Sequence, residues 1–193
     1  MEKTFYSAVY RGNVEEVKDI LRNNPSLNVN WKNVAVGAST ALSCACRYGH
    51  DSIVSILLAH PDIDPNLEDE GGSTPFMIAC FKGYTSFVRL LLQDQRAMVN
   101  EPDNGGDTPL RKAASKGHQD VIKWWIASGR EIDLGKPGDV DKTDAIGVAR
   151  REKETEVVTL LERFKSDAAK TRNEARLELG INGSHPFTFF LFN

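Results

Sequence analysis

The stretch GGDTPLRKAASKGHQDVIKWWI, residues 105–126, decides the fold of this chain. It could form one helix with a glycine in its centre, or two short helices that fold back at Gly117. Thr108-Pro109 is typical of a helix start, because the hydroxyl caps free N–H groups and proline in the first turn loses no hydrogen bond. Glycine adopts the left-handed conformation that ends a helix at low cost. The stretch therefore predicts two helices joined at Gly117.

The same pattern recurs along the chain with a nearly constant period. GGSTPFMIACFKGYTSFVRLLL occupies residues 71–92, and GASTALSCACRYGHDSIVSILL occupies residues 37–58. Residues 3–21 and 143–164 fit more loosely, the latter without the central glycine. A period near 33 residues with one helix pair per unit indicates a stacked helical array. The glycines at the fold-back are 37, 34 and 34 residues apart: Gly12, Gly49, Gly83 and Gly117.

These units resemble ankyrin repeats, whose Thr-Pro-Leu and following alanine stand here at residues 108–110 and Ala113. The resemblance covers about residues 3–165 and implies an all-α solenoid of stacked helix-turn-helix units with β-hairpin fingers between them. The expected units are 3–36, 37–70, 71–104, 105–140 and 141–165. The family's histidine after Thr-Pro-Leu is absent, because Ser43, Met77 and Arg111 stand there.

We divide the chain into an ankyrin-repeat domain, residues 1–165, and a C-terminal part, residues 166–193. Ser166–Gly180 reads as one more helix, with Asp167 as its N-cap and Gly180 as its end. The apolar tail FTFFLF, residues 187–192, either covers the last repeat or docks on a partner. A truncated or frame-shifted terminus would also produce such a tail.

Composition limits the classes of function. The formal net charge of −3 argues against a nucleic-acid partner, because domains that bind nucleic acids are strongly basic. The three cysteines, Cys44, Cys46 and Cys80, suit a reducing compartment. No signal peptide and no membrane span is evident. We expect a monomer in the cytoplasm, with the nucleus as the alternative, and no membrane partner.

No pattern in the sequence predicts catalysis, a cofactor or a metal. Cys44 and Cys46 point to different faces of one helix and are expected to be buried. His50 and His118 lie two units apart, on the order of 20 Å for helices about 10 Å wide, which is too far for a shared metal. Trp124 and Trp125 are expected in the core. We therefore expect a protein that is not an enzyme.

The resemblance implies a binding surface on the concave face, formed by the last turn of each first helix and by the finger tips. Every unit contributes a basic residue there and the first three add an aromatic one, whereas the fingers are acidic. There are two interpretations of these positions. They are ordinary solvent-exposed residues with no partner, or they form a groove that binds a segment of another protein. The helix positions are Tyr10, Arg11, Arg47, Tyr48, Phe81, Lys82, Ser115, Lys116 and Arg151, and the finger positions include Glu68, Glu70, Asp107 and Asp139.

The expected function is that of a non-enzymatic interaction module, an adaptor or an inhibitor. Aromatic residues would anchor an acidic or amphipathic segment of another protein, and the basic residues Arg11, Arg47, Lys82 and Lys116 would steer it. Two alternatives stay open. The chain could be a regulatory subunit or fragment of a larger enzyme, or a substrate for asparagine hydroxylation at Asn30 and Asn100, as in some ankyrin proteins.

Overall fold

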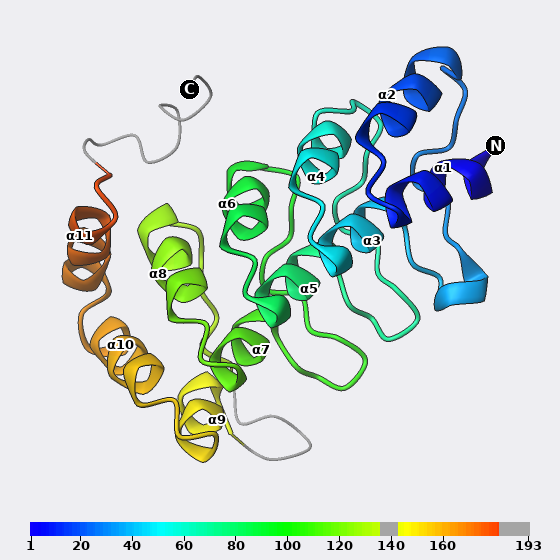
Figure 1. Ribbon diagram of the computed structural model, residues 1–193. Helices are drawn as coiled ribbons and strands as arrows, with labels where there is room; N and C mark the ends of the chain where they lie inside the picture. Colours follow the sequence, from blue (N-terminus) through cyan, green and yellow to red (C-terminus); the bar gives the residue numbers. More distant parts are fainter. Residues whose placement is uncertain (136–142, 182–193) are drawn as a thin grey trace.

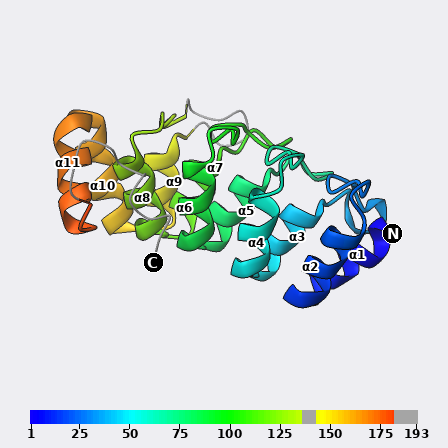
Figure 2. The same cartoon turned by 90° about the horizontal axis from the view of Figure 1, so that it is seen from above.

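A computed structural model describes residues 1–135 and 143–181 of the chain, and these form a curved array of helices in two rows (Figures 1 and 2). The tail at residues 187–192 and Asp139 lie outside the described residues. The first row, called the inner helices, is α1 (Glu2–Tyr10), α3 (Ala41–Tyr48), α5 (Pro75–Lys82), α7 (Pro109–Ser115) and α9 (Ala145–Arg151). The second row, called the outer helices, is α2 (Val14–Asn23), α4 (Asp51–Leu58), α6 (Thr85–Gln93), α8 (Gln119–Ser128) and α10 (Thr155–Ser166).

Each inner helix packs against the next inner helix, and α2, α4, α6 and α8 do the same in the second row. The residues 105–126 thus form two helices, α7 and α8, as the sequence predicts. The last helix, α11 (Ala168–Glu178), packs against both α10 and α8 (Figure 1). The unit boundaries and the division at residue 165 stay predictions.

The inner helices begin where the sequence predicts. The hydroxyls of Thr40, Thr74 and Thr108 accept hydrogen bonds from the backbone N–H groups three residues later, at 3.1–3.3 Å. Pro75 and Pro109 occupy the first turn of α5 and α7. Side-chain capping of this kind satisfies N–H groups that would otherwise lack a partner.

The fold-back glycines allow a left-handed turn, and they also lie where a side chain of the next unit comes close to the backbone. Gly83 has a φ of +73°, and a Cβ built on it would lie 2.6 Å from the His118 ring of the next unit. A Cβ on Gly12 would lie 2.7 Å from the His50 ring, whereas one on Gly49 would lie 3.3 Å from the Tyr84 hydroxyl. The left-handed backbone therefore favours glycine at all three positions, and the neighbouring histidine ring also excludes a side chain at Gly12 and Gly83.

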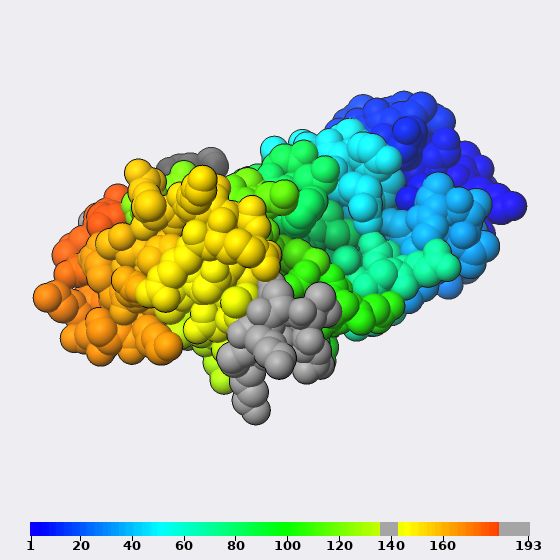
Figure 3. All heavy atoms as spheres, turned by 90° about the horizontal axis from the view of Figure 1, so that it is seen from below, coloured from blue at the N-terminus to red at the C-terminus, as the bar shows by residue number. Residues whose placement is uncertain are grey.

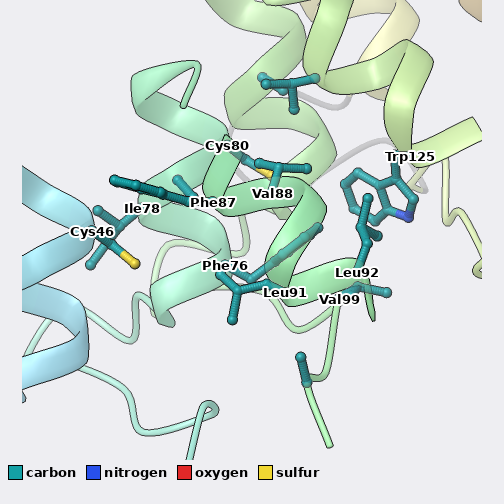
Figure 4. Close-up of a cluster of buried hydrophobic side chains, with 14 of the residues drawn as sticks. Cys46, Phe76, Ile78, Cys80, Phe87, Val88, Leu91, Leu92, Val99 and Trp125 are labelled. Atoms are coloured by element: carbon teal, nitrogen blue, oxygen red, sulfur yellow. The ribbon is translucent and has the colours of Figure 1, made fainter. Parts of the chain in front are cut away.

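The interior runs continuously from one unit to the next (Figure 4). Phe76 of α5 meets Trp125 of α8 edge to face, with ring centroids 4.9 Å apart. Cys44 and Cys46 are fully buried in the same cluster, as expected, and Cys80 is buried there as well. Trp124, also expected in the core, is only partly buried, because its ring faces Arg89, whose guanidinium carbon lies 4.1 Å from the ring centroid.

The fingers differ from the expected β-hairpins, because the described residues form no strand. One isolated bridge, Asn33 to Ser39, lies in the first finger, residues 30–40. The second and third fingers, residues 66–74 and 100–108, are tight turns in which Asp69 and Asp103 each accept two backbone N–H groups. Each turn is closed by a backbone hydrogen bond, from the Asp69 N–H to the Ser73 carbonyl and from the Asp103 N–H to the Asp107 carbonyl.

Arginines tie the outer helices of successive units together. Arg96 donates to the carbonyl oxygen of Leu58, the last residue of α4, and to that of Ile63 in the loop that follows. Arg130 repeats this arrangement at the end of α6, where it donates to the carbonyl oxygens of Leu92 and Asp94. The end of α8 is capped by arginines of α11. Arg172 donates to the carbonyl oxygen of Ile126, and Arg176 donates to that of Ala127. Helix α11 therefore completes the series of capped outer helices.

Replacement of Gly83 by alanine should destabilise the fold more than the same change at Gly106. Both glycines have positive φ, so each change costs roughly 1–2 kcal/mol for the left-handed backbone. Only Gly83 faces a neighbouring ring, whereas nothing lies within 4 Å of a Cβ at Gly106. We expect G83A to lower the free energy of unfolding in urea by about 1–3 kcal/mol more than G106A. Equal losses would contradict the proposed contact with His118.

Loss of the arginine caps should release α11. The double change R172A/R176A removes two charged hydrogen-bond donors and should lower the free energy of unfolding by about 1–3 kcal/mol. Hydrogen exchange of the α11 amides should rise at the same time. The control K165A/K170A changes two exposed lysines, of which Lys165 makes only a 3.9 Å ion pair with Asp144 at the surface, and should change the unfolding free energy by less than about 0.5 kcal/mol and leave exchange of the α11 amides unaltered. Protection of α11 that survives R172A/R176A would contradict this role.

Candidate protein-interaction surface

A groove of about 410 Å³ lies between the ends of α1 and α3 and the first two fingers. Seen from below, the described fingers lie side by side along one edge of the elongated array, in light blue, teal and green (Figure 3). The groove is lined by Tyr10, Arg47 and Tyr48 from the helices and by Val36 and Glu70 from the fingers. Of the eleven residues that line the groove, four belong to the set predicted from the sequence: Tyr10, Arg47, Tyr48 and Glu70.

Tyr10 and Tyr48 form an exposed aromatic pair at the groove. Their ring centroids are 4.8 Å apart with an interplanar angle of 77°, and each residue is about half exposed, at 51% and 50%. A tyrosine is already uncharged at neutral pH, and reduced hydration together with the neighbouring Tyr10 raises the pKa of Tyr48 further. The pair therefore offers an apolar surface with hydroxyl groups at its edge, as is common at protein interfaces.

The stacking contact between units also fixes the backbone at the aromatic positions. The Nε2 atom of His50 lies 3.2 Å from the carbonyl oxygen of Tyr10, and that of His118 lies 3.0 Å from the carbonyl oxygen of Phe81. Because a carbonyl only accepts, each ring nitrogen is the donor. The residues that hold neighbouring units together thus also position exposed aromatic side chains.

Three of the predicted cations are paired with carboxylates. Arg47 donates to Asp69 of the second finger at 2.8 Å, and Asp69 is only 12% exposed. Arg11 pairs with Glu16 at 2.9 Å, and Arg151 pairs with Glu152 at 3.1 Å. The charges of Arg11, Arg47 and Arg151 are therefore largely compensated within the chain.

Lys82 and Lys116 are the predicted cations without a carboxylate partner among the described residues. Both are exposed, and Lys116 Nζ lies 5.3 Å from the ring centroid of Phe81, which is itself 41% exposed. Ser115 is half-buried and donates to the carbonyl oxygen of Lys112 at 2.9 Å. The available positive charge thus lies beside Phe81, in the third and fourth units.

The predicted acidic residues also fall into two groups, those that are exposed at the surface and one that is ion-paired within the chain. Glu68 and Glu70 are exposed, and Glu70 lines the groove. Asp107 is paired with Lys112 and Arg111 at 2.6 and 2.9 Å. Burial acts to raise the pKa of Asp107, but hydrogen bonds from both cations outweigh it and the pKa is lowered. Glu68 and Glu70 therefore carry the acidic character of the rim, whereas Asp107 braces the third finger.

Val34 and Val36 are exposed residues of the surface that were not predicted. They lie on a 3₁₀ turn, η1 (Val34–Val36), in the first finger, and are 81% and 53% exposed. The finger is two residues longer than its successors, which was the available signal in the sequence. The pattern Val-Ala-Val within a polar loop could have directed attention to these side chains.

The described residues contain no group of histidine, cysteine and carboxylate side chains with the arrangement of a metal site. Burial raises the pKa of Cys44, Cys46 and Cys80, which disfavours reactive thiolates. The side chains of Asn30 and Asn100 each hydrogen-bond two backbone groups of the next unit. Within the described part of the chain, these polar groups therefore have structural contacts.

Residues 5–103 and 62–137 match a family model described as ankyrin repeats in three copies. The chain belongs to the ankyrin-repeat family. Ankyrin repeats are generally protein–protein interaction modules. A search of curated proteins found no match to this chain. None of the described helices is long and apolar enough to cross a membrane.

The different environments of Arg47 and Lys82 predict different effects of charge reversal. R47E places a second carboxylate beside Asp69 and should lower the free energy of unfolding by about 1 kcal/mol, since the half-exposed ion pair is lost and repulsion replaces it. K82E removes no ion pair and should change the unfolding free energy by less than about 0.5 kcal/mol. Chemical denaturation of both variants measures this difference. Equal stability of the two variants would show that the Arg47–Asp69 pair has no structural role.

Proposed function

We propose that this protein is a non-enzymatic adaptor or inhibitor that binds an acidic or amphipathic segment of another protein along its concave face. The observation that carries the proposal is the grouping of exposed aromatic residues with two uncompensated lysines on one side of the array. Tyr10, Tyr48 and Phe81 supply apolar contact area, and Lys82 and Lys116 supply the charge.

Stacking supports this function through rigidity. The backbone at Tyr10 and Phe81 is held by hydrogen bonds from the next unit, so these anchors are ordered before a partner arrives. A surface that is ordered in advance loses little conformational entropy on binding. An array of this kind can therefore bind by presenting side chains, without any change in its own fold.

The sequence left two alternatives open, a substrate of asparagine hydroxylation and a regulatory subunit or fragment of an enzyme. No specific contact among the described residues favours either of them. Hydroxylation at Asn30 or Asn100 would require the loop to open, because both functions of each amide are hydrogen-bonded. The role of a regulatory subunit or enzyme fragment is compatible with the same surface. The monomeric state and the cytoplasmic or nuclear location remain predictions.

The charge reversal K82E/K116E tests the proposal. Affinity capture from extract of the source cell should recover a partner with the wild type, and the variant should bind it roughly tenfold more weakly or worse, since repulsion replaces attraction. Binding by the wild type should weaken as salt rises, and this dependence should be flatter in the variant.

The matched control is K165E/K170E, which changes the net charge equally at two exposed lysines of the C-terminal helices. This control should capture the partner as well as the wild type. Capture that is undiminished by K82E/K116E, or reduced equally by the control, would contradict binding along the concave face.

A further inference from the structure

The first finger carries exposed apolar side chains beside the aromatic pair. Eight large apolar residues are exposed in the described part of the chain, and five of these come from the first finger or the ends of the inner helices. These five are Tyr10, Val34, Val36, Tyr48 and Phe81. Four of them, all but Val34, line the groove or lie beside Lys116. Because soluble proteins rarely gather exposed apolar residues without a use, these four indicate a contact surface.

Val36 and the tyrosine pair enclose one end of the groove. Val36, Tyr10 and Tyr48 all line the same space of about 410 Å³, a size within the range of sites that take bulky side chains. Val34, two residues away on the same turn, does not line it. The longer finger therefore adds an apolar wall to this end of the groove.

Charge changes sign along the surface. At the end with Tyr10 and Tyr48, Arg47 is compensated by Asp69, and Glu70 leaves a negative charge in the groove. In the next two units, Lys82 and Lys116 are the available charges. An acidic side chain is therefore repelled at the first end and attracted beside Phe81.

We infer that an extended protein segment binds here with a bulky apolar residue in the groove beside Val36 and an acidic residue outside the groove, at Lys82 or Lys116 of the following units. This inference rests on the binding function proposed above. Neighbouring units are about 10 Å apart and an extended chain advances about 3.3 Å per residue. The acidic residue therefore lies about three to six residues from the apolar one.

A random 16-residue peptide library displayed on phage tests this inference with the full chain as bait. The enriched peptides should pair a bulky apolar residue with an acidic residue at the stated spacing. Binding of the most enriched peptide, measured by fluorescence anisotropy, should weaken about fivefold to tenfold in V36S, because part of the apolar wall is lost. It should change less than about twofold in the control V34S, because Val34 stands outside the groove.

Three results would overturn the inference: no enrichment above an unrelated bait, enriched peptides without the paired residues, or equal effects of V36S and V34S. Both valines are exposed, so neither change threatens the fold, and a denaturation curve verifies this. If K82E/K116E abolishes binding of the enriched peptides while V36S leaves their affinity unchanged, the apolar pocket is contradicted and the proposed function is not. Capture of the cellular partner that is insensitive to K82E/K116E would contradict the function itself.

Discussion

The structure depends on one contact that recurs between units: a side chain at the start of each outer helix lies against the left-handed glycine of the unit before it. His50, Tyr84 and His118 occupy this position over Gly12, Gly49 and Gly83. The contact joins successive units, and where the side chain is histidine it also hydrogen-bonds the backbone carbonyl of an exposed aromatic residue. Packing inside the array and geometry on its surface are therefore consequences of the same constraint.

Much of this architecture was predictable because it repeats. Thr74, Pro75 and Gly83 have local roles that follow from hydroxyl capping, proline geometry and positive φ, and the structure confirms each of them. The repeat period then located equivalent residues in other units. Features that occur once were harder to predict: the packing of α11 on α8 depends on arginines that reach carbonyl groups 46 and 49 residues away.

The surface was predictable in position but not in charge. Repeat register placed Arg47 and Lys82 in the last turn of successive inner helices, two residues and one residue before the fold-back glycine, and both are accessible to solvent. Sequence alone could not tell that Arg47 reaches Asp69 in a finger 22 residues later, because ion pairing depends on how the finger folds back. Val36 was missed for a similar reason, since its exposure follows from a 3₁₀ turn within a longer finger.

The central claim is that the concave side of a rigid array is the part that meets another protein. Site-specific cross-linking tests it most directly, with photoreactive p-benzoylphenylalanine placed in turn at Tyr48 in the groove and at Ser55, exposed on outer helix α4. The account predicts that illumination joins the partner to the chain from position 48 and not from position 55. Cross-links that form from position 55, with none from position 48, would contradict it.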